Sequence, residues 1–187
     1  MRVPPIKYLM VDGEGNPNQA APFRDGIGAL YGCAYTLKFA LRASRAIDFR
    51  VMPLSARYHA DDPSAFADGP VAGWRWTIMI PVPSAVTASD LKRAKAELRR
   101  KRGESAAVEA VRLEMLREGR CAQLLHVGPW SDERANIEKL HAFVRERGLG
   151  LAGSHHEIYL SDPNRTKPEK LKTIVRQPVA ARRPHRG

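Results

Sequence analysis

The sequence is poor in cysteine and has no long hydrophobic run. Cys33 and Cys121 are its two cysteines, too few for a disulfide framework or for a zinc site with four cysteine ligands. Its longest apolar runs fall far short of the roughly 20 residues that span a bilayer, and the N-terminus lacks the apolar segment of a secretory signal. We therefore expect a cytoplasmic protein without a membrane span, whose two thiols stay reduced in the core.

The motifs of several large enzyme classes are missing as well. Gly13-Glu14-Gly15 lacks the third glycine of a dinucleotide fingerprint, and the chain has no Gly-Lys-Ser/Thr phosphate loop and no Gly-x-Ser-x-Gly elbow. His155-His156-Glu157 holds three metal-ligating side chains, but on a strand His156 faces away from the other two. Since nothing in the sequence places a further ligand beside them, we expect no metal and no cofactor.

The positive charge is concentrated in two segments. The formal net charge is +11. Residues 92–102 contain seven basic side chains and one acidic one, and residues 165–187 contain eight basic and one acidic. Because the rest of the chain is slightly acidic, the charge does not mark the whole domain as a nucleic-acid binder. We interpret the first segment as a solvated helix face and residues 180–187 as a basic, disordered tail.

Periodicity and turn residues predict alternating helices and strands. Helices are expected over about Ala20–Ser44, from Thr87 or Ser89 to Arg102, and from Ser131 or Asp132 to Arg147. Strands are expected at Ile6–Asp12, Arg50–Leu54, Trp74–Val82, Ser154–Leu160 and Leu171–Arg176, with an exposed loop at Asp61–Gly73. Glu109–Leu116 and Arg120–Val127 are expected to form a hairpin that turns at Arg117-Glu118-Gly119. An antiparallel hairpin among interleaved helices favours the α+β class.

Several segments together resemble one known family. The most informative are His155–Pro163 (HHEIYLSDP) and Pro168–Val179 (PEKLKTIVRQPV). Supporting segments are Val11–Asn18, Leu30–Phe39, Trp74–Ile80 and His126–Trp130. In this order and spacing, over about residues 5–179, they closely resemble the GyrI-like small-molecule-binding family.

The resemblance implies an architecture and a range of functions. It implies a domain at 1–179 with two pseudosymmetric halves, each an antiparallel sheet packed with a helix, and a ligand cleft between the halves. In that family the domain serves as the drug sensor of transcription activators, in gyrase-inhibitory proteins, and in proteins that hydrolyse cyclopropane-containing genotoxins. The first expected strand begins at about residue 5, so we expect a stand-alone member without a DNA-reading domain.

Glu157 is the main candidate for the site, because it resembles the family's central carboxylate. A carboxyl buried among aromatic rings has a raised pKa, and a cationic ligand restores its charge. Without such a ligand the same group can act as an acid or base near neutral pH. The alternative is an exposed strand glutamate paired with an arginine.

Aromatic side chains are expected to form the walls of the cleft. The candidates for ligand binding are Trp76, Tyr31, Tyr35, Tyr58, Tyr159 and Tyr8, whose rings can stack on planar ligands or bind cations. Ordinary core packing is the alternative for Trp76, and packing of the first helix on its sheet is the alternative for Tyr31 and Tyr35. One departure from the family concerns Val51–Leu54, which continues as Ser55–His59 where relatives usually have Glu-Gly-Leu-Trp-Trp. Tyr58 or His59 then replaces a pocket tryptophan, and Ser55 replaces a glutamate.

Three functions are compatible with these residues. The leading hypothesis is a protein that binds bulky planar or cationic organic molecules, a drug or xenobiotic, with Glu157 at the base of the cleft. The second is a hydrolase in which Glu157 activates water against a strained ring and a tyrosine, Tyr31, stabilises the developing charge. The third is a gyrase-inhibitor-like protein that acts through the basic helix and tail. The sequence leaves the oligomeric state open.

Overall fold

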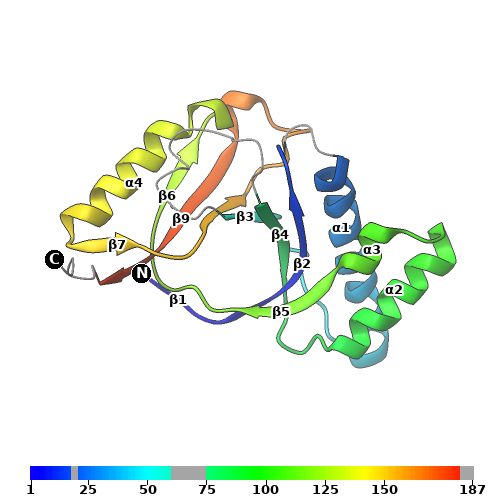
Figure 1. Cartoon of the computed structure of the whole chain (residues 1–187). Helices are drawn as coiled ribbons and strands as arrows, with labels where there is room; N and C mark the ends of the chain where they lie inside the picture. Colours follow the sequence, from blue (N-terminus) through cyan, green and yellow to red (C-terminus); the bar gives the residue numbers. More distant parts are fainter. Residues whose placement is uncertain (18–20, 60–74, 182–187) are drawn as a thin grey trace.

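The protein is described by a computed structural model that covers residues 1–17, 21–59 and 75–181. Its helices are α1 (Ala21–Arg45), α2 (Ala88–Arg102), α3 (Ala106–Ala110) and α4 (Arg134–Glu146), with short 3-10 turns η2 (Trp130–Asp132) and η3 (Pro168–Lys170). Its strands are β1 (Arg2–Val3), β2 (Ile6–Glu14), β3 (Ser55–His59), β4 (Arg75–Val82), β5 (Arg112–Leu116), β6 (Gly119–Val127), β7 (Leu149–Leu151), β8 (His155–Tyr159) and β9 (Lys172–Ala181). The α+β class predicted from the sequence is confirmed (Figure 1).

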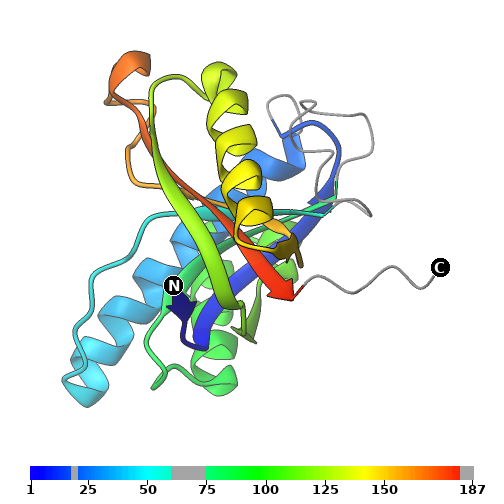
Figure 2. The same cartoon turned by 90° about the vertical axis from the view of Figure 1, so that its left-hand side faces the viewer.

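The described strands form one curled antiparallel sheet that divides into two similar halves. Its order is β1-β6-β9-β8-β3-β4-β2-β5, with β7 added beside β9. In one half α1 packs on β2 and β4, and in the other α4 packs on β6, β7 and β9. Figure 2 shows α4 lying along β6 and β9. The halves join where β3 pairs with β8, with Ser55 opposite Ile158.

The predicted hairpin at 109–127 is wrong. β5 pairs with β2 and β6 pairs with β1, so the two strands do not pair with each other. Val3 lies opposite Gly119 and Ile6 lies opposite Leu116, which is one antiparallel register continued across the junction of the halves. A tight turn would place Glu118 in water, whereas its side chain is buried here against Arg176. The long-range pairing therefore replaces the local turn.

The helices α1 and α4 cover the same face of the sheet. Directly paired residues point to the same side of neighbouring strands. Val175, which packs with α4, is paired with Glu157, Glu157 with Ala56, and Ala56 with Ile78. Ile78 lies against Gly26 of α1. Glu157 therefore projects on the helical face, between α1 and α4.

Two further expectations are corrected at strand boundaries. The strand expected at Arg50–Leu54 is an extended segment, and pairing starts at Ser55. Pro53, which has no N–H to donate to a ladder, lies just before the start of this pairing. The expected tail begins too early, because Ala180 pairs with Gly150 inside β9. Residues 182–187 and the loop expected at Asp61–Gly73 lie outside the described residues.

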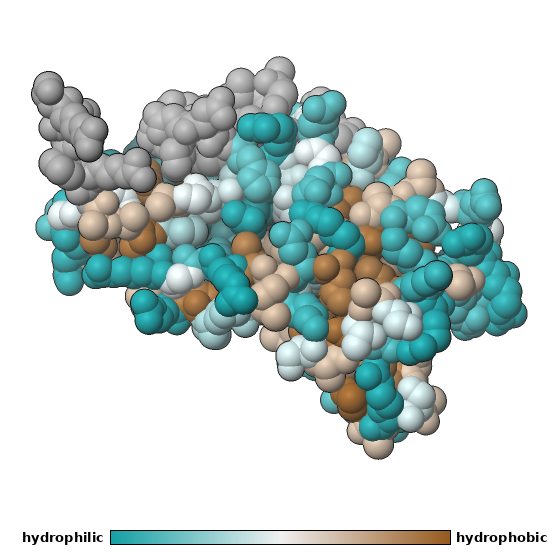
Figure 3. Space-filling model, turned by 60° about the horizontal axis from the view of Figure 1, so that its bottom comes forward, coloured by the Kyte–Doolittle hydropathy of each residue, from teal (hydrophilic) through white to brown (hydrophobic). Residues whose placement is uncertain are grey.

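The larger hydrophobic core belongs to the first half. Leu30, Leu37 and Trp76 are buried between α1 and the strands, with Leu9 and Ile80. Thr87 caps α2 as expected, through a reciprocal capping box with Asp90. On the face shown in Figure 3, hydrophobic side chains gather in patches among hydrophilic ones. None of the helices in the described segments has the length and apolar character needed to cross a bilayer.

Candidate functional site

A cavity of about 890 Å³ opens between the two halves, on the helical face of the sheet. Its walls come from α1, the extended segment before β3, the start of α4, β8 and the loop after β8. The apolar lining consists mainly of Phe23, Ile27, Tyr31, Tyr35, Val51, Leu54, Tyr58, Trp130, Ile137 and Tyr159. Such a volume, apolar with a few polar groups, is typical of a small-molecule site. The cleft predicted between the halves is present.

Glu157 lies in this cavity with both carboxylate oxygens engaged. His155 Nε2 lies 3.1 Å from Oε1, and the Tyr159 hydroxyl donates to Oε2 at 2.9 Å. All three residues come from β8 and share one face because their spacing is two. The alternative of an exposed glutamate paired with arginine does not hold, since the Glu157 side chain is mostly buried and contacts these two groups.

A second tyrosine extends this arrangement. The Tyr58 and Tyr159 hydroxyl oxygens are 2.8 Å apart. Because Tyr159 donates its proton to Glu157, its oxygen accepts the proton of Tyr58. Burial and the charge of Glu157 raise the pKa of both phenols well above 10.0, so both keep their protons at neutral pH. The chain Tyr58–Tyr159–Glu157 joins the halves, since Tyr58 belongs to β3.

A second carboxyl in the cavity was not foreseen from the sequence. Glu133, just before α4, lines the cavity and is only 4% exposed. Its Oε1 is buried and has no hydrogen-bonding partner among the described residues. Burial first, and then the charge of Glu157, raise the pKa of Glu133 from 4.5 to about 9. At neutral pH the cavity thus holds a neutral carboxylic acid beside Glu157.

The turn before α4 places Glu133 in the cavity. His126 bonds the Pro129 carbonyl at 3.0 Å and the Asn136 side chain at 2.8 Å, so the ring clamps the turn to the helix. Trp130 Nε1 donates to Thr173 Oγ1 at 3.1 Å, and its ring lies edge-on to Tyr159. The predicted cap at Ser131 or Asp132 is one or two residues early, because η2 precedes the helix and its N-cap is Glu133.

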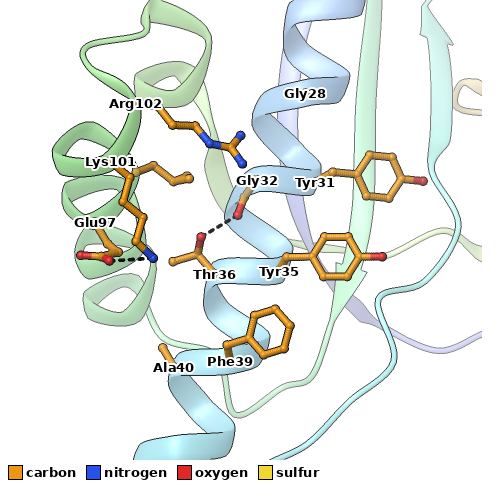
Figure 4. Close-up of a pocket in the computed structure, with 11 residues that line it drawn as sticks. Gly28, Tyr31, Gly32, Tyr35, Thr36, Phe39, Ala40, Glu97, Lys101 and Arg102 are labelled. Carbon is orange, nitrogen blue, oxygen red and sulfur yellow. Dashed lines mark hydrogen bonds and ion pairs between the residues drawn. The ribbon is translucent and has the colours of Figure 1, made fainter.

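Tyr31 and Tyr35 reach the cavity from α1. Figure 4 shows both rings pointing away from α2, on the opposite side of α1 from Glu97 and Lys101. The rings stack with centroids 6.4 Å apart, and Tyr35 is 48% exposed at the mouth. Tyr31 is half-buried, and desolvation raises its pKa. No described contact joins Tyr31 to Glu157, and the tyrosine bonded to that carboxylate is Tyr159.

Two of the expected aromatic residues lie elsewhere. Trp76 is 1% exposed in the core, edge-on to Phe23, and its Nε1 donates to the Gly15 carbonyl at 3.2 Å. Its ring fills the space where a side chain at Gly13 would lie, which explains glycine there. Tyr8 is buried on the opposite face of the sheet beside Met79. Core packing, the alternative stated for Trp76, is what the structure shows.

At Ser55–His59, where the sequence departs from the family, the side chains point to the two faces of the sheet. Tyr58 faces the cavity. His59 faces away and bonds Thr77 and Ser154, each at 2.8 Å, and Ser55 bonds the Met79 carbonyl on that same side. Tyr58, and not His59, therefore provides the aromatic ring at this place in the cavity.

The metal-ligating side chains are used for hydrogen bonds instead. His155 contacts Glu157, whereas His156 Nδ1 contacts Glu118 at 2.8 Å on the other face. Within residues 1–17, 21–59 and 75–181, no group of three or more histidine, cysteine, aspartate or glutamate side chains is arranged to hold a metal ion. The chemistry of the site therefore lies in two carboxyls, a pair of phenols and aromatic walls.

A sequence signal for Glu133 does exist. Glu133, Ile137, Leu140 and Val144 follow the helical spacing of one face, and the last three are the buried stripe of α4. A carboxyl that continues an apolar stripe is buried with it, unless the helix ends first. The prediction of a cap at Ser131 or Asp132 assigned this position to an exposed first turn.

Known structures share this architecture. An uncharacterised conserved protein from Listeria innocua is 34% identical with a TM-score of 0.87, and a hydrolase from Listeria innocua is 34% identical with a TM-score of 0.83. Each match covers 96% of this chain and 90% of the other. The EcmrR C-terminal domain shares the fold at 11% identity and a TM-score of 0.58, covering 97% of this chain and 95% of that domain. No curated protein matches the chain.

The family itself is shown by a match to nearly the whole chain. The model of the GyrI-like small molecule binding domain matches residues 2–180, which include both halves of the sheet and every residue that lines the cavity. The chain belongs to the GyrI-like small-molecule-binding domain family.

Proposed function

We propose that this protein binds bulky organic molecules, planar or cationic, in the cavity between its halves, with Glu157 as the polar anchor. One observation carries the proposal, namely a carboxylate held by Tyr159 and His155 on the floor of an aromatic cavity of about 890 Å³. Apolar walls supply affinity by burial, and a fixed charge in a medium of low dielectric selects the ligand. Tyr31, Tyr35 and Trp130 supply faces on which planar rings stack.

The test is the affinity for ethidium, a planar aromatic ion with one fixed positive charge. Replacement of Glu157 by glutamine keeps the shape and the hydrogen bond from Tyr159 but removes the charge. We expect affinity to fall about 30-fold, the equivalent of about 2 kcal/mol, because an ion pair in a desolvated site is lost. Glu138→Gln, on the exposed side of α4, is the matched control. Equal affinity for ethidium in the wild type and Glu157→Gln would refute the anchor.

A second candidate is a hydrolase that uses the same groups. It is favoured by the hydroxyl chain from Tyr58 through Tyr159 to Glu157, because a carboxylate oriented by a phenol can take a proton from water. Relatives of similar length and 34% and 33% identity are described as hydrolases. The substrate class to test is a strained electrophilic ring such as a cyclopropane.

Mass spectrometry separates turnover from sequestration. Incubation with an excess of a cyclopropane-bearing electrophile should yield product that has gained one water molecule, at more than one equivalent per protein. Tyr159→Phe should slow this turnover, and Tyr31→Phe serves as the comparison, since Tyr31 was the tyrosine expected from the sequence. A single stoichiometric burst without further product would contradict the hydrolase.

A further inference from the structure

The cavity contains two carboxyl groups, whereas a singly charged ligand needs one of them as its counter-ion. Glu157 is satisfied by two donors. Glu133 lies in the same cavity, buried, with Oε1 unpartnered among the described residues. An unsatisfied buried carboxyl is costly to keep, and such groups in a ligand site are commonly satisfied by the ligand. Nothing in the proposed anchor role of Glu157 makes use of it.

We propose that the cavity is a two-pole site for organic dications, in which Glu157 receives one positive centre and Glu133 receives the second. This rests on the proposed function and specifies its ligand class. Glu133 keeps its proton while the site is empty or holds a singly charged ligand, and it releases that proton to the solvent when a second positive centre binds. The site therefore matches its charge to that of the ligand.

The surroundings of Glu133 support this exchange. Glu157 of β8 and Tyr58 of β3 interact electrostatically with Glu133, and His155, Tyr159 and Tyr31 line the same cavity. Burial and the charge of Glu157 are what keep the acid protonated. A cation that enters between the two carboxyls neutralises the charge of Glu157 and stabilises the ionised form of Glu133. Its binding therefore favours loss of the proton from Glu133.

The charged groups at the mouth of the cavity do not take the role that we propose for Glu133. Arg50, Arg134, Arg165 and Asp162 line the rim and are exposed to solvent. Arg134 is engaged with Glu138 and Arg165 with Asp162. The net charge of +11 also opposes nonspecific attraction of dications, so a preference for the doubly charged ligand must arise from local carboxyls.

Ethidium and propidium test the proposal as a matched pair. They share one ring system, and propidium carries a second quaternary ammonium on its side chain. We expect the wild type to prefer propidium, with a ratio of affinities that rises about tenfold per pH unit between pH 6 and 8, because one proton leaves with the second charge. Calorimetry in two buffers of different ionisation enthalpy should show about one proton released for propidium and none for ethidium.

Two variants locate the second pole. Glu133→Gln, similar in shape to the protonated acid, should bring the affinity ratio close to one and remove its pH dependence. Asp162→Asn changes the carboxyl at the rim and should leave the ratio and its slope as in the wild type. Circular dichroism and thermal unfolding confirm that each variant is folded.

The possible outcomes separate the two proposals. A ratio that does not change with pH while ethidium still binds through Glu157 overturns the two-pole site and leaves the proposed function standing. Loss of the preference in Asp162→Asn, and not in Glu133→Gln, also overturns it. Failure of both dyes to bind the wild type overturns the proposed function and the two-pole site together.

Discussion

The two faces of the sheet each bury a glutamate, in opposite states. On the face away from the helices, Glu118 contacts His156 at 2.8 Å and Arg176 at 2.9 Å. Desolvation alone would raise the pKa of Glu118, but these partners outweigh it and hold the pKa below its usual value. On the helical face, desolvation of Glu133 is not offset and its pKa rises to about 9. Glu118 is thus paired within the protein, whereas Glu133 lies in the cavity where we propose that a ligand binds.

Removal of the paired glutamate should have the largest effect on stability. Glu118→Ala leaves Arg176 buried without its carboxylate partner, and we expect the free energy of unfolding to fall by about 3–5 kcal/mol. Urea denaturation measures this change. Glu146→Ala, an exposed residue near the end of α4, should change it by less than about 0.5 kcal/mol. If Glu118→Ala lowers the free energy of unfolding no more than Glu146→Ala does, the pair of Glu118 and Arg176 does not stabilise the fold as we expect.

Glu133, unlike Glu118, should destabilise the fold as the pH rises. Its folded pKa lies above its unfolded value of 4.5, so the folded protein holds a proton that the unfolded chain has lost. Stability is therefore full below about pH 4.5 and falls as pH rises toward 9, by at most about 1.4 kcal/mol per pH unit. Glu133→Gln removes this pH-dependent loss of stability. The variant should therefore gain stability relative to the wild type when the pH is raised from 5 to 8. Parallel urea curves at both pH values test this, and an identical gap would contradict it.

The phenol chain should contribute an intermediate amount. Tyr159→Phe removes the donor to Glu157 and the acceptor of Tyr58. We expect a loss of about 1–3 kcal/mol, because a hydrogen bond to a charged group is broken. Chemical denaturation measures it, with Tyr31→Phe as the control on the opposite wall of the cavity. A loss no greater than that of the control would show that the chain does not hold Glu157.

The mouth of the cavity should matter least for folding. Tyr35 is 48% exposed and stacks on its helical neighbours Tyr31 and Phe39. Tyr35→Ala should change stability by about 0.5 kcal/mol or less and should weaken ethidium binding by about tenfold or less, because a stacking surface is lost. Thermal unfolding and dye titration measure the two effects. A large loss of stability would place Tyr35 in the core.

The sequence predicts those parts of the molecule that depend on local pattern. The spacing of Leu30, Leu37 and Leu41 defines α1, and Trp74–Val82 nearly coincides with β4. Arg117-Glu118-Gly119 has the composition of a turn, but pairing with residues more than a hundred positions away overrides it. Glu133 is missed because the expected cap at Ser131 or Asp132 places it in an exposed first turn, and its raised pKa depends on burial and on Glu157 in another element. Strand parity alone allows Trp76 to face either the core or the cavity, and its burial, at 1% exposed, places it in the core.

The pairing of β1 with β6 and of β2 with β5 has a mechanical consequence. The N-terminal segment is hydrogen-bonded to both halves in one register, which skips Pro4 and Pro5, and the Met1 backbone also bonds Cys121 in the second half. This pairing therefore links the two halves to each other at the edge of the sheet. Under the proposed function, we expect ligands of different size to be accommodated by rotation of exposed rings such as Tyr35, rather than by a change in the distance between the halves.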